Sequence, residues 1–201
     1  MAKIRLTKNE LKKQKDSLKM YKRYLPTLML KKQQLQGEIR ITDTRLRELH
    51  LEQEQLDETF KAWIAVFGET GVFTTDILKI TGIRTGHGNI AGVPIPVFIG
   101  ADFEITGYSL TVTPPWLDTA VECMKRVLLL QLEAEIVEEQ KKLLDKELRT
   151  TTQRVNLFEK IKIPEARDNI KKIQVYLGDQ QTAAVVRGKI AKSGFEKAAS
   201  K

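Results

Sequence analysis

The sequence has few of the residues from which compact enzymes build their cores and metal sites. Aromatic residues make up 6% of its 201 residues, so a large core of buried rings is not expected. The single cysteine, Cys123, excludes an internal disulfide framework and fits a reducing compartment. Two histidines, His50 and His87, leave too few ligands to hold a metal together with that one thiol.

Long apolar runs are missing as well. No stretch reaches the ~20 apolar residues that a membrane-spanning helix needs, and residues 1–5 lead into charged sequence without the apolar core of a signal peptide. Charged residues instead make up 30% of the chain, with a formal net charge of +8. Average soluble chains hold about 25%. We therefore expect a highly charged, soluble, intracellular protein.

Glycine and proline divide the chain into parts. Residues 68–115 contain eight of the twelve glycines, four of the six prolines and only six charged residues. This composition predicts a turn-rich insert at 68–115 between two charged arms. The arms are residues 1–67 and 116–192, each expected to be a coiled-coil helix, and residues 193–201 are expected to form a disordered tail.

The arms carry apolar residues at heptad spacing. Ile4, Leu11, Leu18 and Leu25 follow one another at intervals of seven, and the stripe continues to residue 67 at spacings of three, four or seven. A helix over residues 3–67 would be about 100 Å long at 1.5 Å per residue. Such a helix must pack along a partner of similar length, and the second arm supplies one.

The second arm repeats the pattern and suggests a register. One antiparallel register would pair Ile4 with Leu177, Leu11 with Ile170, and Leu18 with Ile163. A shift by a whole heptad would satisfy the same pattern. The fold class expected is therefore mainly α, a long antiparallel two-helix coiled coil with a small β-hairpin-containing insert at one end. Residues after about 180 would extend beyond the pairing as a helical tip.

The insert has β-branched residues in short alternating runs. These runs predict short strands at residues 72–74, 77–78, 93–99 and 108–112, forming an antiparallel element at the far end of the helical pair. Pro94 and Pro96 confine their strand to an edge, because neither can donate a ladder hydrogen bond.

The familiar catalytic motifs are not found. Gly86-His87-Gly88-Asn89-Ile90-Ala91-Gly92 misses the dinucleotide-binding spacing by one residue, and hairpin turns are the simpler interpretation. Gly188-Lys189 is followed by Ile190, where a phosphate-binding loop needs Ser or Thr. Carboxylates such as Glu133 and Glu138 lie near lysines at helical spacing, which indicates solvated, salt-bridging faces. We expect no catalytic, cofactor-binding or metal site.

Charge is distributed unevenly along the arms. Residues 1–32 hold eleven Lys or Arg against two acidic residues, and the stretch from Arg187 onward adds +4. Antiparallel pairing would bring both basic ends together. A basic end attracts phosphate backbones, anionic lipid or an acidic protein surface. Tyr21 and Tyr24, interleaved with basic residues, keep nucleic acid among the alternatives, and a solvated basic face without a specific partner is another.

Residues 151–164 carry a motif that resembles a known family. The elements Arg154-Val155-Asn156, Glu159 and Ile163-Pro164 are similar to the signature of the D subunit of the V/A-type rotary ATPases. The first arm supports the resemblance through Leu11, Lys12 and Leu18, so both arms are covered. Pro26, Gly178 and Gly188 depart from the family pattern, and each glycine weakens a helix by about 1 kcal/mol relative to Ala.

The resemblance implies a non-catalytic rotor shaft of the central stalk. It implies that both termini lie inside the ring of catalytic and regulatory head subunits, and that the insert end faces the membrane rotor through a connecting subunit. The smaller F subunit of the stalk would bind alongside, and the protein would be cytoplasmic and peripheral to the membrane, without inserting into it. Contacts to the head would then come from the basic end, through Lys12, Lys15, Lys19, Arg187 and Lys189.

The two helix-internal prolines suggest a mechanical feature. Pro26 and Pro164 would lie near each other in the antiparallel register, and each removes one backbone hydrogen bond. We expect the shaft to bend there, so that rotation pushes catalytic subunits in turn.

Two other classes of function fit parts of the pattern. A free-standing helical-hairpin chaperone or scaffold of the prefoldin kind would also place a β-hairpin between two helices, and a nucleic-acid-binding coiled coil would use the basic end.

Overall fold

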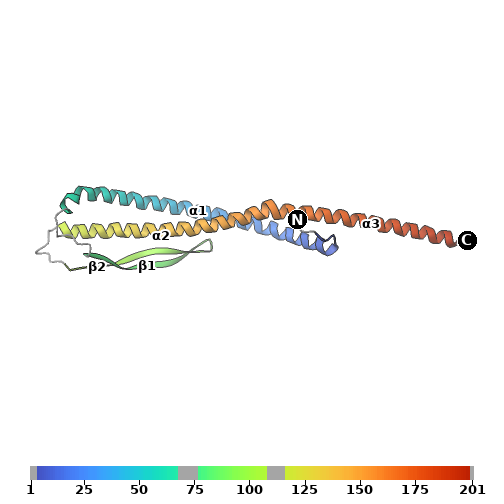
Figure 1. Cartoon of the computed structure of the whole chain (residues 1–201), viewed down its shortest axis with the longest axis horizontal. Coiled ribbons are helices and arrows are strands. Elements are labelled where there is room, and N and C mark those ends of the chain that lie inside the picture. The colour runs from blue at the N-terminus through green and yellow to red at the C-terminus, as the bar shows by residue number, and fades with distance from the viewer. Residues whose placement is uncertain (1–3, 68–76, 108–115, 200–201) are drawn as a thin grey trace. The chain divides into compact units, whose positions relative to one another are not determined.

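The computed structural model describes residues 4–67, 77–107 and 116–199, and it is mainly helical. The elements in chain order are α1 (Lys8–Phe67), β1 (Leu78–Ile90), β2 (Val93–Ile105), α2 (Trp116–Asn156), the π-helical turn η1 (Leu157–Lys162) and α3 (Ile163–Ala199) (Figure 1). The predicted fold class, two long helices with a β-hairpin between them in sequence, is confirmed.

The chain forms two compact units. We call residues 1–30 and 151–201 the terminal unit, and residues 31–150 the central unit. Helix α1 contributes residues to both units, as do the helical residues after Trp116. Each unit is described by itself below.

Helix α1 begins at a capping sequence. The hydroxyl oxygen of Thr7 accepts a hydrogen bond from the backbone N–H of Glu10 at 3.3 Å. A Thr hydroxyl at this position is an N-cap, which satisfies one of the backbone donors that the first helical turn leaves free. The helix then runs for 60 residues and includes Pro26. Next to that proline, the Thr27 hydroxyl donates to the Tyr24 carbonyl at 2.8 Å.

Helix α3 continues further than the sequence analysis expected. It extends to Ala199, so residues 193–199 are helical where a disordered tail beginning at 193 was expected. The sequence explains the difference, because Lys and Ala in this stretch have high helix propensity and outweigh the single Gly194. The glycines at 178 and 188 also lie inside this helix.

Within its described residues 77–107, the insert forms one hairpin of two long strands, where short strands were predicted at 77–78 and 93–99. Strands β1 and β2 each have 13 residues and pair antiparallel from Leu78 opposite Ile105 to Ile90 opposite Val93. Among the residues that the structure describes, the sheet has two strands, and β2 with its prolines is an edge strand, as expected. The predicted strands at 72–74 and 108–112 lie outside the described residues.

The turn of the hairpin occupies only the end of the glycine-rich run. Ala91 and Gly92 both have positive φ, 51° and 81°, which is the signature of a two-residue type I′ turn. The Asn89 side-chain oxygen accepts from the Gly92 N–H at 2.9 Å and supports this turn. The prediction of turns was therefore wrong for Gly86 and Gly88, which lie within β1.

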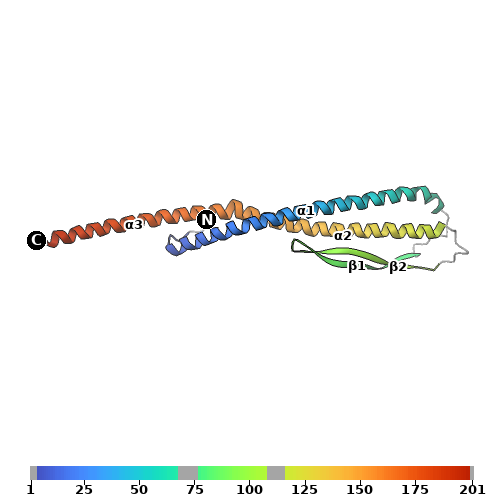
Figure 2. The ribbon, with the colours of Figure 1, turned by 180° about the vertical axis from the view of Figure 1, so that it is seen from behind.

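The hairpin lies along α2 within the central unit. At its base, Ile77 packs in a buried cluster with Leu117 and Val121, and at its tip Val93 packs with Leu144. Leu117 and Leu144 are 27 residues apart on α2, which corresponds to about 40 Å of helix. Both ribbon views show the hairpin beside α2 (Figures 1 and 2).

The core of the central unit is a thin seam with three buried clusters. The tip cluster contains Leu35 of α1 and Leu144 of α2, both fully buried, together with Val93 and Ile95 of β2. A second cluster joins Leu49 of α1 to α2 and contains no strand residue; its buried α2 members are Leu130, Ala134 and Val137. The hairpin tip therefore contacts both helices.

Candidate functional site

The terminal unit places the predicted seam residues at partly or fully buried positions. Ile163 is buried, while Leu11, Leu18, Ile170 and Leu177 are half-buried. Ile4, the remaining predicted seam residue, is half-buried as well. None of the six side chains is fully exposed to solvent, as the predicted pairing of the two helices requires.

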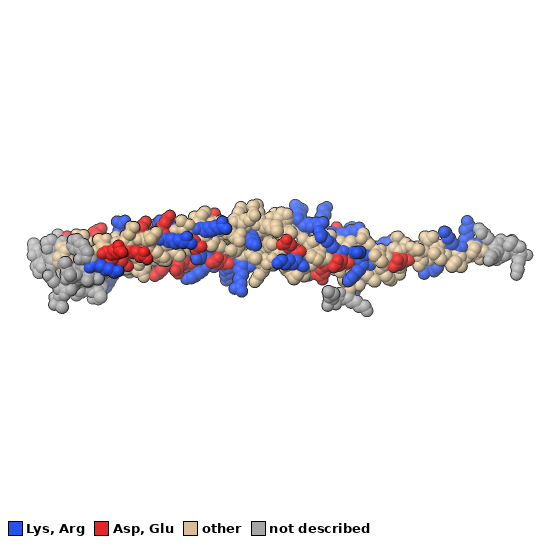
Figure 3. Space-filling model, turned by 90° about the horizontal axis from the view of Figure 1, so that it is seen from above, with Lys and Arg blue, Asp and Glu red and all other residues tan. Residues whose placement is uncertain are grey.

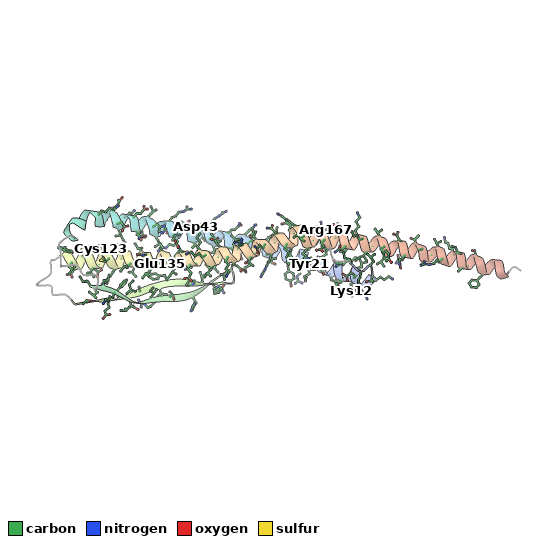
Figure 4. All side chains as sticks on the ribbon, viewed as in Figure 1. Lys12, Tyr21, Asp43, Cys123, Glu135 and Arg167 are labelled. Carbon is green, nitrogen blue, oxygen red and sulfur yellow. The ribbon has the colours of Figure 1, made fainter. Side chains whose placement is uncertain are left out.

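Two contacts in this unit lie close to the predicted register. The ring centroids of Tyr21 and Phe158 lie 5.2 Å apart. The predicted register places Lys160, which is two residues beyond Phe158, opposite Tyr21. Leu6 lines a shallow groove together with Val175, the residue opposite it in the predicted register. Tyr21, labelled in Figure 4, is therefore held by an aromatic contact, although the sequence analysis considered it for nucleic-acid stacking.

The family motif coincides with a change in helix geometry. Residues 157–162 form a π-helical turn, in which hydrogen bonds span five residues. The Ile163 N–H accordingly donates to the Phe158 carbonyl, and Pro164 follows directly. Proline has no N–H, and its ring would crowd the carbonyl of Lys160 in a regular α-helix. The wider turn thus lies where the proline demands it, whereas α1 is α-helical through Pro26.

The polar motif residues point to solvent. Arg154, Asn156 and Glu159 are exposed, and their side chains form no ion pair or hydrogen bond within the described part of the chain. Pro26 and Pro164 are exposed as well. The motif's polar side chains are therefore available to another protein surface.

Besides Ile163, which was predicted as a seam residue, the motif contains two buried residues that were not predicted. Thr151 is 1% exposed and Val155 is 4% exposed. Thr151 follows Leu144 at heptad spacing and Val155 follows Leu148 at the same spacing, so extending the heptads from α2 would have found them. Asn169 is also buried, at 7% exposure, in the same unit.

The predicted contact residues of the basic end are all exposed. Lys12, Lys15 and Lys19 lie on α1, and Arg187 and Lys189 lie on α3. None of the five forms an ion pair within residues 4–67, 77–107 and 116–199. Lys12 is labelled in Figure 4, and blue side chains mark the last part of α3 in Figure 3.

The two units differ strongly in charge. The terminal unit contains twenty Lys and Arg against seven Asp and Glu, a formal charge of +13, while the central unit contains fourteen against nineteen, a charge of −5. The net charge of the chain therefore comes entirely from the terminal unit. A surface of this charge favours an acidic partner.

Helix α3 also exposes apolar side chains towards its end. Every described side chain from Gly178 to Phe195 is exposed, including Ile190 at 65% and Phe195 at 76%. Exposed apolar side chains on an otherwise charged helix are typical of a surface that binds another protein.

Among the described residues of the central unit, three ion pairs join α1 to α2. Lys31 pairs with Glu147, Asp43 with Lys141, and Arg45 with Glu133, each at 2.7 Å. The hydrogen bonds that Arg45 donates to the Glu133 carboxylate raise the pKa of Arg45, and the hydrogen bond that Lys141 donates to the Asp43 carboxylate raises the pKa of Lys141. The charge pattern of α2 predicted a solvated face for Glu133, but Glu133 pairs with Arg45 on the other helix.

Sites for a metal or a membrane span are not found in the described segments. No three His, Cys, Asp or Glu gather there in a way that could hold a metal ion. None of the described helices combines the length and the apolar character needed to cross a bilayer. Cys123 is half-buried and His50 is exposed on α1.

Comparison with known proteins gives a consistent result. The model of the family described as the ATP synthase D subunit matches residues 10–193. A V-type ATP synthase D subunit from Borreliella burgdorferi is 52% identical over 197 residues, covering 98% of this chain and 97% of the relative. The protein of the same name from Chlamydia pneumoniae is 36% identical and covers 96% and 93% of the two chains. Neither the chaperone nor the nucleic-acid alternative finds support in these matches.

Proposed function

Because this chain belongs to the family of ATP synthase D subunits, we propose that it is the central-stalk rotor shaft of a V-type rotary ATPase. In this role it transmits torque between the membrane ion-translocating rotor and the catalytic head and carries out no catalysis itself. The observation that carries the proposal is the family match along nearly the whole helical pair, from residue 10 to residue 193.

The charge of the terminal unit supports contact with the catalytic head. A formal charge of +13 suits acidic or polar loops on several surrounding subunits. Lys12, Lys15 and Lys19 form one such set on α1, and Arg187 and Lys189 form another on α3. The exposed apolar residues of α3, such as Ile190, add contacts that need no charge.

The proposed partners follow from the family. They are the catalytic and regulatory head subunits, the F subunit of the stalk and the subunit that connects the stalk to the membrane rotor ring. The protein would be cytoplasmic and peripheral to the membrane as part of the complex. The exposed motif side chains Arg154, Asn156 and Glu159 are suited to one of these contacts, because no other described residue engages them.

A bend at the prolines remains part of the proposal. The π-turn before Pro164 interrupts the regular hydrogen-bond pattern, and π-turns and prolines are the usual sites of helix kinks. A bent shaft would press on catalytic subunits one after another as it rotates.

Reconstitution tests the function. The chain is mixed with the catalytic and regulatory subunits, with and without the F subunit of the stalk, and rotation of a bead attached to the stalk is followed during ATP hydrolysis. We expect a stoichiometric complex whose ATPase activity and rotation depend on this chain. Unchanged activity without it, with all partners folded, would remove the rotor assignment, and salt-sensitive RNA binding by the isolated chain would favour the nucleic-acid alternative.

A further inference from the structure

Four charged residues on α1 follow one another at heptad spacing and alternate in sign. They are Lys31, Glu38, Arg45 and Glu52, and we call them the charge ladder. Residues seven apart lie on the same side of a coiled-coil helix, beside the apolar seam. The ladder therefore presents a positive, negative, positive and negative side chain to α2 in turn.

Helix α2 presents a matching set in the central unit. Lys31 pairs with Glu147 and Arg45 with Glu133, both at 2.7 Å. These two pairs define a register in which Gln140 stands opposite Glu38 and Arg126 stands opposite Glu52. Gln140, the uncharged residue of this set, bonds to the hairpin: its side-chain amide donates a hydrogen bond to the Pro96 carbonyl at 2.6 Å.

The apolar seam alone does not distinguish this register from a shifted one. A heptad pattern repeats, so sliding α1 by seven residues keeps apolar side chains opposite one another. Leu35, for example, would face Val137 in place of Leu144 after a slide in one direction, and Thr151 after a slide in the other. Another feature must exclude the shifted pairing.

The ladder excludes it in both directions. A shift of seven residues one way would place Glu38 opposite Glu147 and Glu52 opposite Glu133. A shift the other way would place Glu38 opposite Glu133 and Arg45 opposite Arg126. Like charges at facing coiled-coil positions repel, and they set partner choice and orientation in such helices.

A third ion pair, outside the ladder, is lost in the same shifts. Asp43 pairs with Lys141 at 2.7 Å in the observed register. A shift of one heptad leaves Asp43 opposite Leu148 in one direction and opposite Ala134 in the other. The observed register is thus the only one of the three that pairs Lys31, Asp43 and Arg45 with opposite charges and places no like charges of the ladder opposite each other.

We propose that the charge ladder sets the axial register of α1 against α2 in the central unit, by making a one-heptad slide in either direction repulsive. The alternation of sign is the essential feature, since a ladder of uniform sign would face the Glu147 and Glu133 carboxylates equally well after a slide. The proposal does not depend on the rotor function, because it concerns pairing within this chain.

Pulsed electron spin resonance can measure the register in the full-length chain. Cys123→Ser removes the native thiol, and Arg47→Cys with Glu139→Cys supplies two exposed labelling sites outside the ladder, one on each helix. A slide of seven residues displaces the labels by about 10 Å along the helix axis. The unmodified ladder should give one distance population.

The decisive variant is Glu38→Lys with Glu52→Lys, which makes the ladder uniformly positive. After a slide the introduced lysines would face Glu147 and Glu133, so we expect a second distance population displaced by about 10 Å along the axis. The matched control is Glu54→Lys with Glu58→Lys, two exposed positions on α1 that change the net charge equally. The control should keep the single distance.

The other outcomes overturn the proposal. If the ladder variant keeps one unchanged distance, the apolar seam and the hairpin tip set the register without the ladder. If the control slides as well, total charge and not alternation is responsible. Should the lysine variant fail to fold by circular dichroism, Glu38→Gln with Glu52→Gln removes the repulsion without adding charge. A second population then supports the proposal and a single unchanged distance refutes it.

Discussion

Ile163 donates its backbone N–H to the carbonyl of Phe158, five residues earlier, and the next residue is Pro164. The hydrogen-bond span therefore widens by one residue directly before the position that cannot donate. This relationship gives the Ile-Pro ending of the motif a physical meaning, since the pair marks the end of the π-turn.

Replacing Pro164 should stabilise the helix. Proline inside a helix is about 3 kcal/mol less favourable than alanine, and the π-turn already relieves part of the steric conflict. We expect Pro164→Ala to raise the free energy of unfolding by roughly 1–3 kcal/mol in urea titrations followed by circular dichroism. Pro26→Ala, in a helix without a π-turn, serves as the comparison. It should raise the free energy of unfolding by at least as much. Loss of stability in Pro164→Ala would mean that neighbouring contacts, not the proline, maintain the π-turn.

The seam of the central unit should be sensitive at its most buried position. Leu144 is fully buried in the cluster that joins both helices and the hairpin tip. Leu144→Ala should therefore lower the free energy of unfolding by about 2–5 kcal/mol. Leu51 on α1 is 57% exposed, so Leu51→Ala should change the free energy of unfolding by less than about 0.5 kcal/mol. Equal effects of the two substitutions in urea titrations would contradict the assigned core.

The helices were predictable because their signal is repetitive. Leucines and isoleucines at heptad spacing over Ile4–Leu25 can be satisfied only by a long helix with a long partner. Proline and glycine between the arms also indicated where α1 ends and α2 begins, at Phe67 and Trp116. The ion pairs across the helices were harder to assign, since a carboxylate such as Glu133 has lysines at helical spacing on its own helix as well as a partner on the other.

The hairpin was only partly predictable, because glycine conceals its alternation. Gly86 and Gly88 stand opposite Val97 and Ile95, and side chains from β2 occupy the space above these glycines. Apolar side chains of β2 therefore cover the glycine positions of β1. The sequence of β1 itself does not show the apolar alternation with a period of two that marks a strand. Two glycines separated by one residue were consequently interpreted as turn, although both positions are paired with β2.

Gly88 should not tolerate a side chain. A Cβ at this position would lie 2.9 Å from Val97 Cγ2 and 3.1 Å from Ile95 Cγ1. Gly88→Ala should therefore cost about 1–3 kcal/mol through overpacking. Gly82 in the same strand has nothing within 4 Å of that position, and Gly82→Ala should be neutral or slightly stabilising. Thermal unfolding of both variants checks the contrast, and a neutral Gly88→Ala would show that β2 moves freely away.

The pair of Asp43 and Lys141 should contribute stability that disappears at high pH. The Asp43 hydrogen bond raises the pKa of Lys141 above its ordinary value of 10.5. The contribution is therefore fully present below pH 10.5 and is lost as the pH rises through the raised value. In Asp43→Asn, NMR titration should show the pKa of Lys141 moving down towards its ordinary value. The same pKa in both proteins would exclude Asp43 as the cause.

The basic end should bind the catalytic head in a salt-dependent way. Lys12, Lys15 and Lys19 are exposed and without ion pairs within the described segments, so replacing all three with Gln removes charge without breaking an internal contact. Exposed pairs contribute about 0.2–1 kcal/mol each, so the dissociation constant for the catalytic and regulatory subunits should rise by roughly 3- to 100-fold at low salt. The difference should shrink in high salt, because screening weakens exposed charge pairs. The control removes three exposed cations of α1 in the central unit, through Arg40→Gln, Arg47→Gln and Lys61→Gln. Equal weakening by both triple variants would mean that net charge, and not the position of the basic end, governs binding.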